Sequence, residues 1–189
     1  MGVLARSFAE DPVFTFLMPP SLPRREARLR RFFALDVARS ARRAGTWVSA
    51  DGSGAAVWFP PGQWHATRRE HLLSLPRWAA LLGSRTAVAD RVLTTMEARH
   101  RELAPHWYCL YLGTEPGRQS QGVGSALLRA VLDRCDREGT PAYLEASCER
   151  NRRLYERHGF TRLEPLPLPD GGPVMFPMWR DPRPATGPH

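Results

Sequence analysis

The chain has 189 residues, of which 42% are hydrophobic and 10% aromatic, which is typical of a globular protein with one sizeable core and excludes a disordered chain. The formal net charge is +8, and arginine supplies all 27 residues of the Lys+Arg count. Isoleucine is also absent, and Asn151 is the only asparagine. This bias is typical of a GC-rich genome, so the charge needs no nucleic-acid partner to explain it. A basic surface still favours an anionic ligand such as a polyphosphate cofactor.

The sequence shows no targeting segment. No apolar run approaches the roughly 20 residues of a membrane helix, and charge interrupts residues 1–12 too early for a secretory signal. Cys109, Cys135 and Cys148 lack metal-ligand spacing and are predicted to be free, buried thiols. We therefore expect a cytoplasmic protein that holds no metal and binds neither a membrane nor a nucleic acid. A homodimer is left open.

The first half of the chain predicts helices around one hairpin. Residues 3–17 suggest a short helix that breaks near Pro12. Residues 23–44 predict an amphipathic helix whose arginine-rich face is interpreted as solvated, because no aromatic or glycine residues interleave it as in an RNA site. "TWVSA" and "AAVWF" predict two strands joined by the turn "DGSG". Two helices are expected over residues 66–104, with Pro76 as a break or kink in the first.

The second half alternates strands and helices. "HWYCLYLGTEP" predicts a strand that is buried on both faces. After the loop "RQSQGVGSALL", a helix is expected from Gly122 to about Glu138. "AYLEA" predicts a short strand, "NRRLYERHG" a short helix, and "FTRLEPLP" with "PVMFPMW" a closing antiparallel hairpin. This order of elements predicts an α/β protein.

The loop between the apolar strand and the following helix is a candidate phosphate site. A helix N-terminus presents unpaired backbone N–H groups to an anion, and glycines let a ligand approach the backbone closely. The loop lacks the G-K-[ST] of a P-loop and the G-x-G-x-x-G of a dinucleotide fold. On its own it is either a phosphate-binding loop or a helix start softened by glycine.

Two longer stretches carry a resemblance to a known family. "LGTEPGRQSQGVGSALL" resembles the acetyl-CoA-binding motif of the GNAT acetyltransferases, [QR]-x-x-G-x-[GA], here Gln119-x-x-Gly122-x-Gly124. "LEASCERNRRLYERHGF" is similar to the second signature of that family, an Asn followed four residues later by a Tyr and then by G-F. "AEDP", "WVSADGSGAAVWF", "LAPHWY" and "PAYLEAS" most resemble the puromycin N-acetyltransferase type, and the likeness covers nearly the whole chain.

The resemblance implies a GNAT fold, with a mixed and mostly antiparallel sheet that splays where acetyl-CoA enters. We expect a single domain over residues 1–180 and a flexible tail over 181–189. A GNAT sheet normally opens with a strand before its first helix. Here Met1 falls almost at that helix, so either the start lies upstream or the sheet lacks its first edge strand.

The resemblance also implies which residues hold the cosubstrate acetyl-CoA. The backbone of Leu112 and Thr114 would bond its pantetheine arm. Asn151 would hydrogen-bond the same arm, and Tyr155 would point at the sulfur. The pyrophosphate would be wrapped by the backbone amides of Gln119, Ser120, Gln121, Gly122, Val123, Gly124 and Ser125.

Elementary chemistry supports two catalytic candidates. Tyr155 lies four residues after Asn151 on one helix face, and a phenol of pKa about 10 can protonate a departing thiolate; Asn151 alone would be interpreted as a helix N-cap. Glu145 is an acidic residue in a mostly apolar strand, where it is either the base that takes the proton of the amine or a carboxylate paired with an arginine.

The implied reaction is direct transfer of an acetyl group from acetyl-CoA to a primary amine of a small molecule, an aminonucleoside-like antibiotic or a metabolite. Backbone amides near Leu110 to Leu112 would stabilise the oxyanion. Acetylation of a protein N-terminus or lysine, or acyl-CoA sensing without turnover, are the alternatives. The acceptor side has weaker candidates. Glu10 and Asp11 either contact a cationic substrate or cap a helix, Phe14, Phe16, Trp58 and Trp64 line a pocket or fill the core, and His65, His71 and His106 are expected on the surface.

Overall fold

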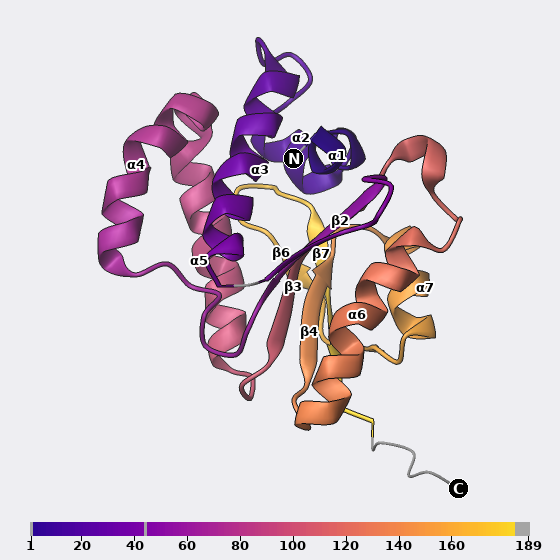
Figure 1. Ribbon diagram of the computed structural model, residues 1–189. Helices are drawn as coiled ribbons and strands as arrows, with labels where there is room; N and C mark the ends of the chain where they lie inside the picture. Colours follow the sequence, from indigo (N-terminus) through magenta and orange to yellow (C-terminus); the bar gives the residue numbers. More distant parts are fainter. Residues whose placement is uncertain (1, 44, 184–189) are drawn as a thin grey trace, which may run out of the picture.

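The computed structural model describes residues 2–43 and 45–183, so the predicted flexible tail lies outside the described residues from position 184 onward. Figure 1 shows a central sheet with helices on both sides. The helices are α1 (Gly2–Ser7), α2 (Pro12–Leu17), α3 (Arg25–Ala41), α4 (Arg68–Leu82), α5 (Thr86–Arg101), α6 (Val123–Glu138) and α7 (Glu149–Arg157). The strands are β1 (Thr46–Val48), β2 (Gly54–Phe59), β3 (Trp107–Thr114), β4 (Ala142–Ala146), β5 (Thr161–Arg162), β6 (Leu166–Pro167) and β7 (Val174–Arg180).

The sheet is mixed and mostly antiparallel, as expected. Its strands follow the order β1-β2-β3-β4-β7-β5, and β6 pairs with β7 off this path. Only the pair of β3 and β4 is parallel. Within the described residues no strand precedes α1, and β1 forms the edge of the sheet. None of the helices in these ranges is long and apolar enough to span a bilayer.

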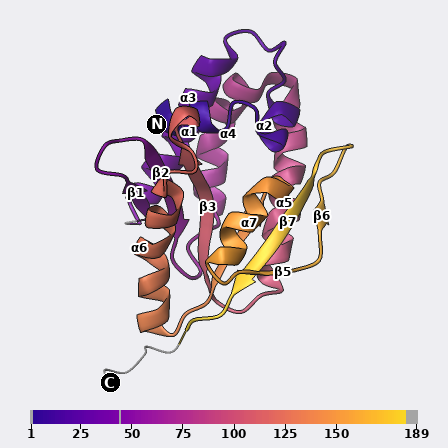
Figure 2. The same cartoon turned by 90° about the vertical axis from the view of Figure 1, so that its right-hand side faces the viewer.

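The core is divided by the sheet into two clusters. All six residues of β2 are buried, and successive side chains point to opposite faces. Val57 and Phe59 pack with side chains of α1 to α5, whereas Trp58 packs with side chains of α6 and α7. Figures 1 and 2 show α3, α4 and α5 on one side of the sheet and α6 and α7 on the other.

Most predicted elements of the second half are confirmed, and three details of the chain differ from expectation. Pro76 lies inside α4, which continues to Leu82; proline kinks a helix without always ending it. The segment "FTRLEPLP" forms two short strands, β5 and β6, in place of one hairpin arm. All three cysteines are free, but Cys148 is only half-buried because it lies at the start of α7.

Strand β3 is irregular at its middle, and this irregularity positions the site. In its ladder with β2, Tyr111 pairs with Val57 and Cys109 with Trp58, so Leu110 is an extra residue in a bulge. The parallel ladder with β4 ends at the pair Cys109 and Leu144. Beyond that pair the strands splay, which leaves the β3 backbone after Cys109 available on its β4 side.

Candidate active site

The glycine loop before α6 is shaped as an anion site. Ser120 and Gly122 adopt left-handed backbone conformations with φ of 62° and 86°, and Gly122 is the N-cap of α6. The first amides of a helix have no intrahelical acceptors, so the N-terminus of α6 can bind an anion. Arg150 of α7 donates to Gln119 at 2.5 Å, which brings a further cation beside the loop.

The surroundings of Gly124 indicate how closely a cofactor arm could approach between β3 and α7. A Cβ added there would find Leu154 at 3.5 Å, Thr114 Oγ1 at 3.8 Å and Leu112 at 3.9 Å. These are ordinary contacts, so packing within the protein does not require a glycine. Gly124 lies near Leu112 and Thr114 at the splayed end of β3, where the resemblance places acetyl-CoA, and a residue without a side chain at this position fits the approach of that cosubstrate.

Helix α7 brings Asn151 and Tyr155 to the wall of one cavity. The N-cap of α7 is Cys148, and Asn151 stands three residues further on, so the interpretation of Asn151 as an N-cap is wrong. Tyr155 is buried and packs edge-on against Phe160. Burial raises the pKa of Tyr155, and the nearby Cys109 and Cys148 thiols raise it further, which keeps the hydroxyl protonated.

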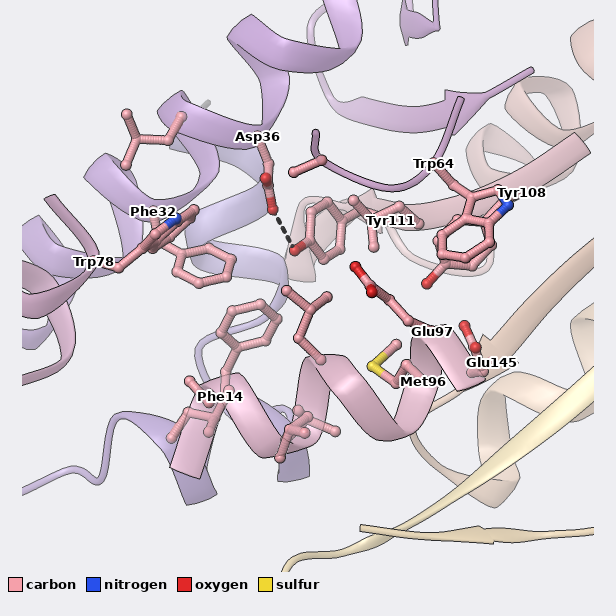
Figure 3. A pocket seen from close by; sticks show the side chains of 18 of the residues that line it. Phe14, Phe32, Asp36, Trp64, Trp78, Met96, Glu97, Tyr108, Tyr111 and Glu145 are labelled. Carbon is pink, nitrogen blue, oxygen red and sulfur yellow. Dashed lines mark hydrogen bonds between the residues drawn. The ribbon is translucent and has the colours of Figure 1, made fainter. Parts of the chain in front are cut away.

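The cavity has a volume of about 490 Å³, lies between the sheet and helices α2 to α5, and extends to Asn151 and Tyr155 of α7. Figure 3 shows its aromatic walls, which include Phe14, Phe32, Trp64, Trp78, Tyr108 and Tyr111. Its described lining also contains the carboxylates of Asp11, Asp36, Glu70, Asp90, Glu97 and Glu145 but only two arginines, Arg42 and Arg77. The hydroxyl of Tyr111 donates to Asp36 at 2.8 Å.

The structure separates the predicted residues into two groups. Leu112, Glu145, Asn151 and Tyr155 line the cavity, together with the bulged residue Leu110. The loop residues 119–125 and Thr114 are not part of its described lining; Gln121, Gly122 and Val123 border a shallow hollow beside β1. Leu112 connects the two groups, because it lines the cavity and also lies against Gly124.

The weaker candidates on the acceptor side also differ in position: some line the cavity and others do not. Asp11 caps α2 by accepting from Val13 N at 2.9 Å and Phe14 N at 3.2 Å, and it lines the cavity as well. Burial raises the pKa of Asp11. Glu10 is exposed. Among the aromatic candidates, Phe14 and Trp64 line the cavity, whereas Trp58 is fully buried in the other core cluster and Phe16 lies under the Arg85 guanidinium.

Glu145 lies at the floor of the cavity on β4, with its side chain only 1% exposed. Its Oε1 atom lies 3.4 Å from His100 Nε2 without a hydrogen bond, so the basic side chain described opposite it is a histidine and not the arginine considered from the sequence. Burial and the Glu145 carboxylate together raise the pKa of Tyr108 and of Tyr143, whose rings flank it.

His106 corrects the expectation of a surface histidine. It is 2% exposed and its Nε2 atom lies 3.0 Å from His100 Nδ1. His100 itself, in the last turn of α5, was not singled out by the sequence. One local signal is present. Val92, Met96 and His100 follow one another at intervals of four residues on one face of α5, and Val92 and His100 are buried. Nothing in the sequence connects that position to β4.

Comparison with known proteins agrees with this geometry. Residues 83–162, which span the segment from α5 to β5, match the family model of the acetyltransferase (GNAT) domain. An uncharacterized N-acetyltransferase of Schizosaccharomyces pombe is 26% identical over 168 residues, 84% of this chain and 68% of the relative. A solved structure from Corynebacterium glutamicum, described as histone acetyltransferase HPA2 and related acetyltransferase, is 28% identical over 97% of this chain and 90% of its own, with a TM-score of 0.67.

A more distant solved structure shares the fold. The polyamine N-acetyltransferase of Drosophila melanogaster is 16% identical and superposes over 95% of this chain and 91% of its own with a TM-score of 0.61. The domain match covers the glycine loop, the splayed strand pair and helix α7, and the homologous acetyltransferases extend over most of the chain. These similarities support an acyltransferase, whose residues 83–162 match a GNAT acetyltransferase domain.

Proposed function

We propose that the protein transfers an acetyl group from acetyl-CoA to the primary amine of a small molecule, with an aminonucleoside-like antibiotic or metabolite as the first class of acceptor. The observation that carries this proposal is the composition of the cavity. On a chain of net charge +8, the described lining is aromatic and contains three times as many carboxylates as arginines, six against two. Such a lining favours a cation with an apolar body.

The donor side of the proposal rests on the loop and on α7. Backbone amides of Gln119 to Ser125 would hold the pyrophosphate, and the splayed backbone at Leu112 and Thr114 would bond the pantetheine arm. Asn151 would hydrogen-bond the same arm from α7. Acetyl-CoA supplies the activated acetyl group when it is bound; every other part of the chemistry belongs to residues of this chain.

Glu145 and Tyr155 are proposed as the proton acceptor and the proton donor. An amine must lose its proton to attack a thioester, and Glu145 lies on the cavity wall where it can take that proton. Backbone amides at Leu110 to Leu112, freed by the bulge and the splay, would stabilise the negative charge that develops on the acetyl oxygen. Tyr155 would then protonate the leaving thiolate.

The shape of the cavity favours a small acceptor over a protein. A volume of about 490 Å³ lies within the range of small-molecule sites, about 300–1,000 Å³. Helices α3, α4 and α5 cover this face of the sheet, as Figure 2 shows from the side, so a lysine or N-terminus on a folded protein would need these helices to move apart.

The test is thiol release from acetyl-CoA with a panel of acceptors. The panel contains an aminonucleoside, an arylalkylamine, a linear polyamine, a peptide with a free N-terminus and a lysine peptide with a blocked N-terminus. We expect turnover with a small amine that carries an aromatic or bulky apolar group, and Glu145→Gln should abolish most of it.

The other outcomes separate the alternatives. Turnover with the peptides alone would make the protein a protein acetyltransferase. Tight binding of CoA without turnover on any amine would leave acyl-CoA sensing as the function.

A further inference from the structure

Three buried polar side chains form a chain of contacts behind the cavity floor. His106 Nδ1 lies 2.6 Å from the Ala104 carbonyl oxygen, His106 Nε2 lies 3.0 Å from His100 Nδ1, and His100 Nε2 lies 3.4 Å from Glu145 Oε1. His100 and His106 are 3% and 2% exposed. The first two contacts are hydrogen bonds, so their direction follows from their neighbours, whereas Glu145 Oε1 accepts no hydrogen bond within the described part of the chain.

The direction is fixed at the Ala104 end. A carbonyl only accepts, so His106 must carry its proton on Nδ1. Burial lowers the pKa of His106, which keeps the ring neutral and leaves a lone pair on Nε2. His100 must therefore donate from Nδ1 to His106. A neutral His100 then presents an unprotonated Nε2 to Glu145 Oε1, and two acceptors face each other with room for one proton between them.

Aromatic rings surround His100. Trp64 stacks on it with ring centroids 4.4 Å apart, and Tyr108 and Tyr143 meet it edge-on at 4.2 and 4.8 Å. Aromatic faces stabilise cations. The other charged or titratable groups around the cluster are those of Glu97, Arg99 and Glu102 near the end of α5 and of Cys109 on β3.

We propose that His100 is a positioning residue that receives, at Nε2, the proton that Glu145 removes from the acceptor amine, and that His106 holds His100 in the accepting tautomer. In the first step an N–H bond of the ammonium breaks and an O–H bond forms on Glu145. In the second step this O–H bond breaks and an N–H bond forms at His100 Nε2. One positive charge moves from the amine to the imidazole, and Glu145 returns to a carboxylate.

A merely structural partner of Glu145 would be built differently. An arginine is always charged, would donate permanently to the carboxylate, and is the commonest charged residue of this chain. An imidazole titrates near neutral pH, and here its second nitrogen is committed to His106. This proton relay from Glu145 to His100 rests on the proposed role of Glu145 as the base. The experiment must therefore distinguish a failure of the relay from a failure of Glu145 as the base.

The test compares kcat and KM across pH for wild type, Glu145→Gln, His100→Gln and a pair of His106 variants. Gln at position 100 keeps a polar atom opposite Glu145 but cannot hold the extra proton. We expect kcat to fall about a hundredfold, the lower end of the range for a positioned proton-transfer group, with KM for acetyl-CoA unchanged and with the acidic limb of the pH profile lost. His106→Gln, which still offers an acceptor to His100, should retain more activity than His106→Leu.

The exposed His65→Gln serves as the matched control and should behave as wild type. A dead Glu145→Gln together with a His100→Gln of wild-type kcat and pH profile would overturn the relay alone. An active Glu145→Gln would overturn the proposed base and the relay with it. If His100→Gln fails to fold, the imidazole ¹⁵N chemical shifts of the wild-type protein test the proposal instead. They report which ring nitrogen of His106 carries the proton, and a proton on Nε2 would contradict the proposal.

Discussion

Tyr155 combines burial, a place on the cavity wall and a pKa that burial raises. Its hydroxyl stays protonated at neutral pH and can donate but not accept a proton. Tyr155→Phe keeps the ring against Phe160 and removes only the donor. We expect kcat to fall about a hundredfold or more, with little change in the KM for acetyl-CoA or in the melting temperature.

Single-turnover rates and calorimetric titration with CoA check this expectation. An unchanged rate would remove Tyr155 from the role of acid. A loss of CoA affinity as large as the loss of rate would assign its hydroxyl to binding instead.

Residues of the site could be predicted where their signal is local. Asn151 and Tyr155 share one short helix, and Glu145 is conspicuous inside an apolar strand. His100 and His106 could not be found in this way. Their partner Glu145 lies on β4, separated from them in the sequence by β3 and α6, and a sequence pattern does not report contacts between distant elements.

The N-terminus of α6 gives the prediction that belongs to an element. Gly124→Ala creates no clash inside the protein, since its Cβ would meet neighbours at ordinary distances, and alanine favours a helix over glycine. The melting temperature should therefore be unchanged or slightly higher. The motif [QR]-x-x-G-x-[GA] accepts alanine at the position of Gly124, so acetyl-CoA affinity should stay close to that of wild type.

Gly117→Ala is the matched control in the same loop, because a Cβ there meets no atom within 4 Å. Equilibrium titration of CoA against both variants compares them directly. A loss of affinity in Gly124→Ala alone would contradict the motif and show that the cofactor passes too close to Gly124 for a methyl group.

Elements with marked ends could be predicted closely. Helix α6 begins after Gly122 and ends before Gly139, two glycines with positive φ that the sequence displays. The end of helix α4 was harder to predict, because Pro76 suggests that the helix stops there, whereas it continues to Leu82. The bulge at Leu110 has no sequence signal; it follows from the register that β2 and β4 impose on the two sides of β3.

At the scale of the whole molecule, the order of strands and helices could be predicted from alternating apolar runs and turns, and it reproduces the GNAT fold. The cavity could not be predicted from the sequence. It forms where α2 to α5 pack over the sheet and reaches α7, and helix periodicity states which side of a helix is apolar but not what lies opposite. Site residues that lie within one segment could therefore be predicted from the sequence, and site residues that several segments bring together could not.

One ion pair links strand β7 to helix α6, at the end of α6 away from the cofactor loop. Arg180 of β7 donates from both terminal nitrogens to Asp136 of α6 at 2.8 Å, and from Nε to the His158 carbonyl after α7 at 2.9 Å. The backbone of Arg183 also donates to Asp136. The guanidinium holds the pKa of Asp136 below its usual range.

Asp136→Asn should lower the free energy of unfolding by about 2 kcal/mol, the value of a hydrogen bond to a charged group, which corresponds to roughly 4–8 °C in melting temperature. A carboxyl whose folded pKa is depressed stabilises above its unfolded pKa of about 3.9 and loses this contribution as the pH falls through the folded value. Melting curves of both proteins from acidic to neutral pH should therefore converge only below about pH 4. The exposed Asp133→Asn, on the same helix, should melt with wild type throughout; a gap between wild type and Asp136→Asn that persists unchanged into acid would assign the loss to packing and not to the charge of Asp136.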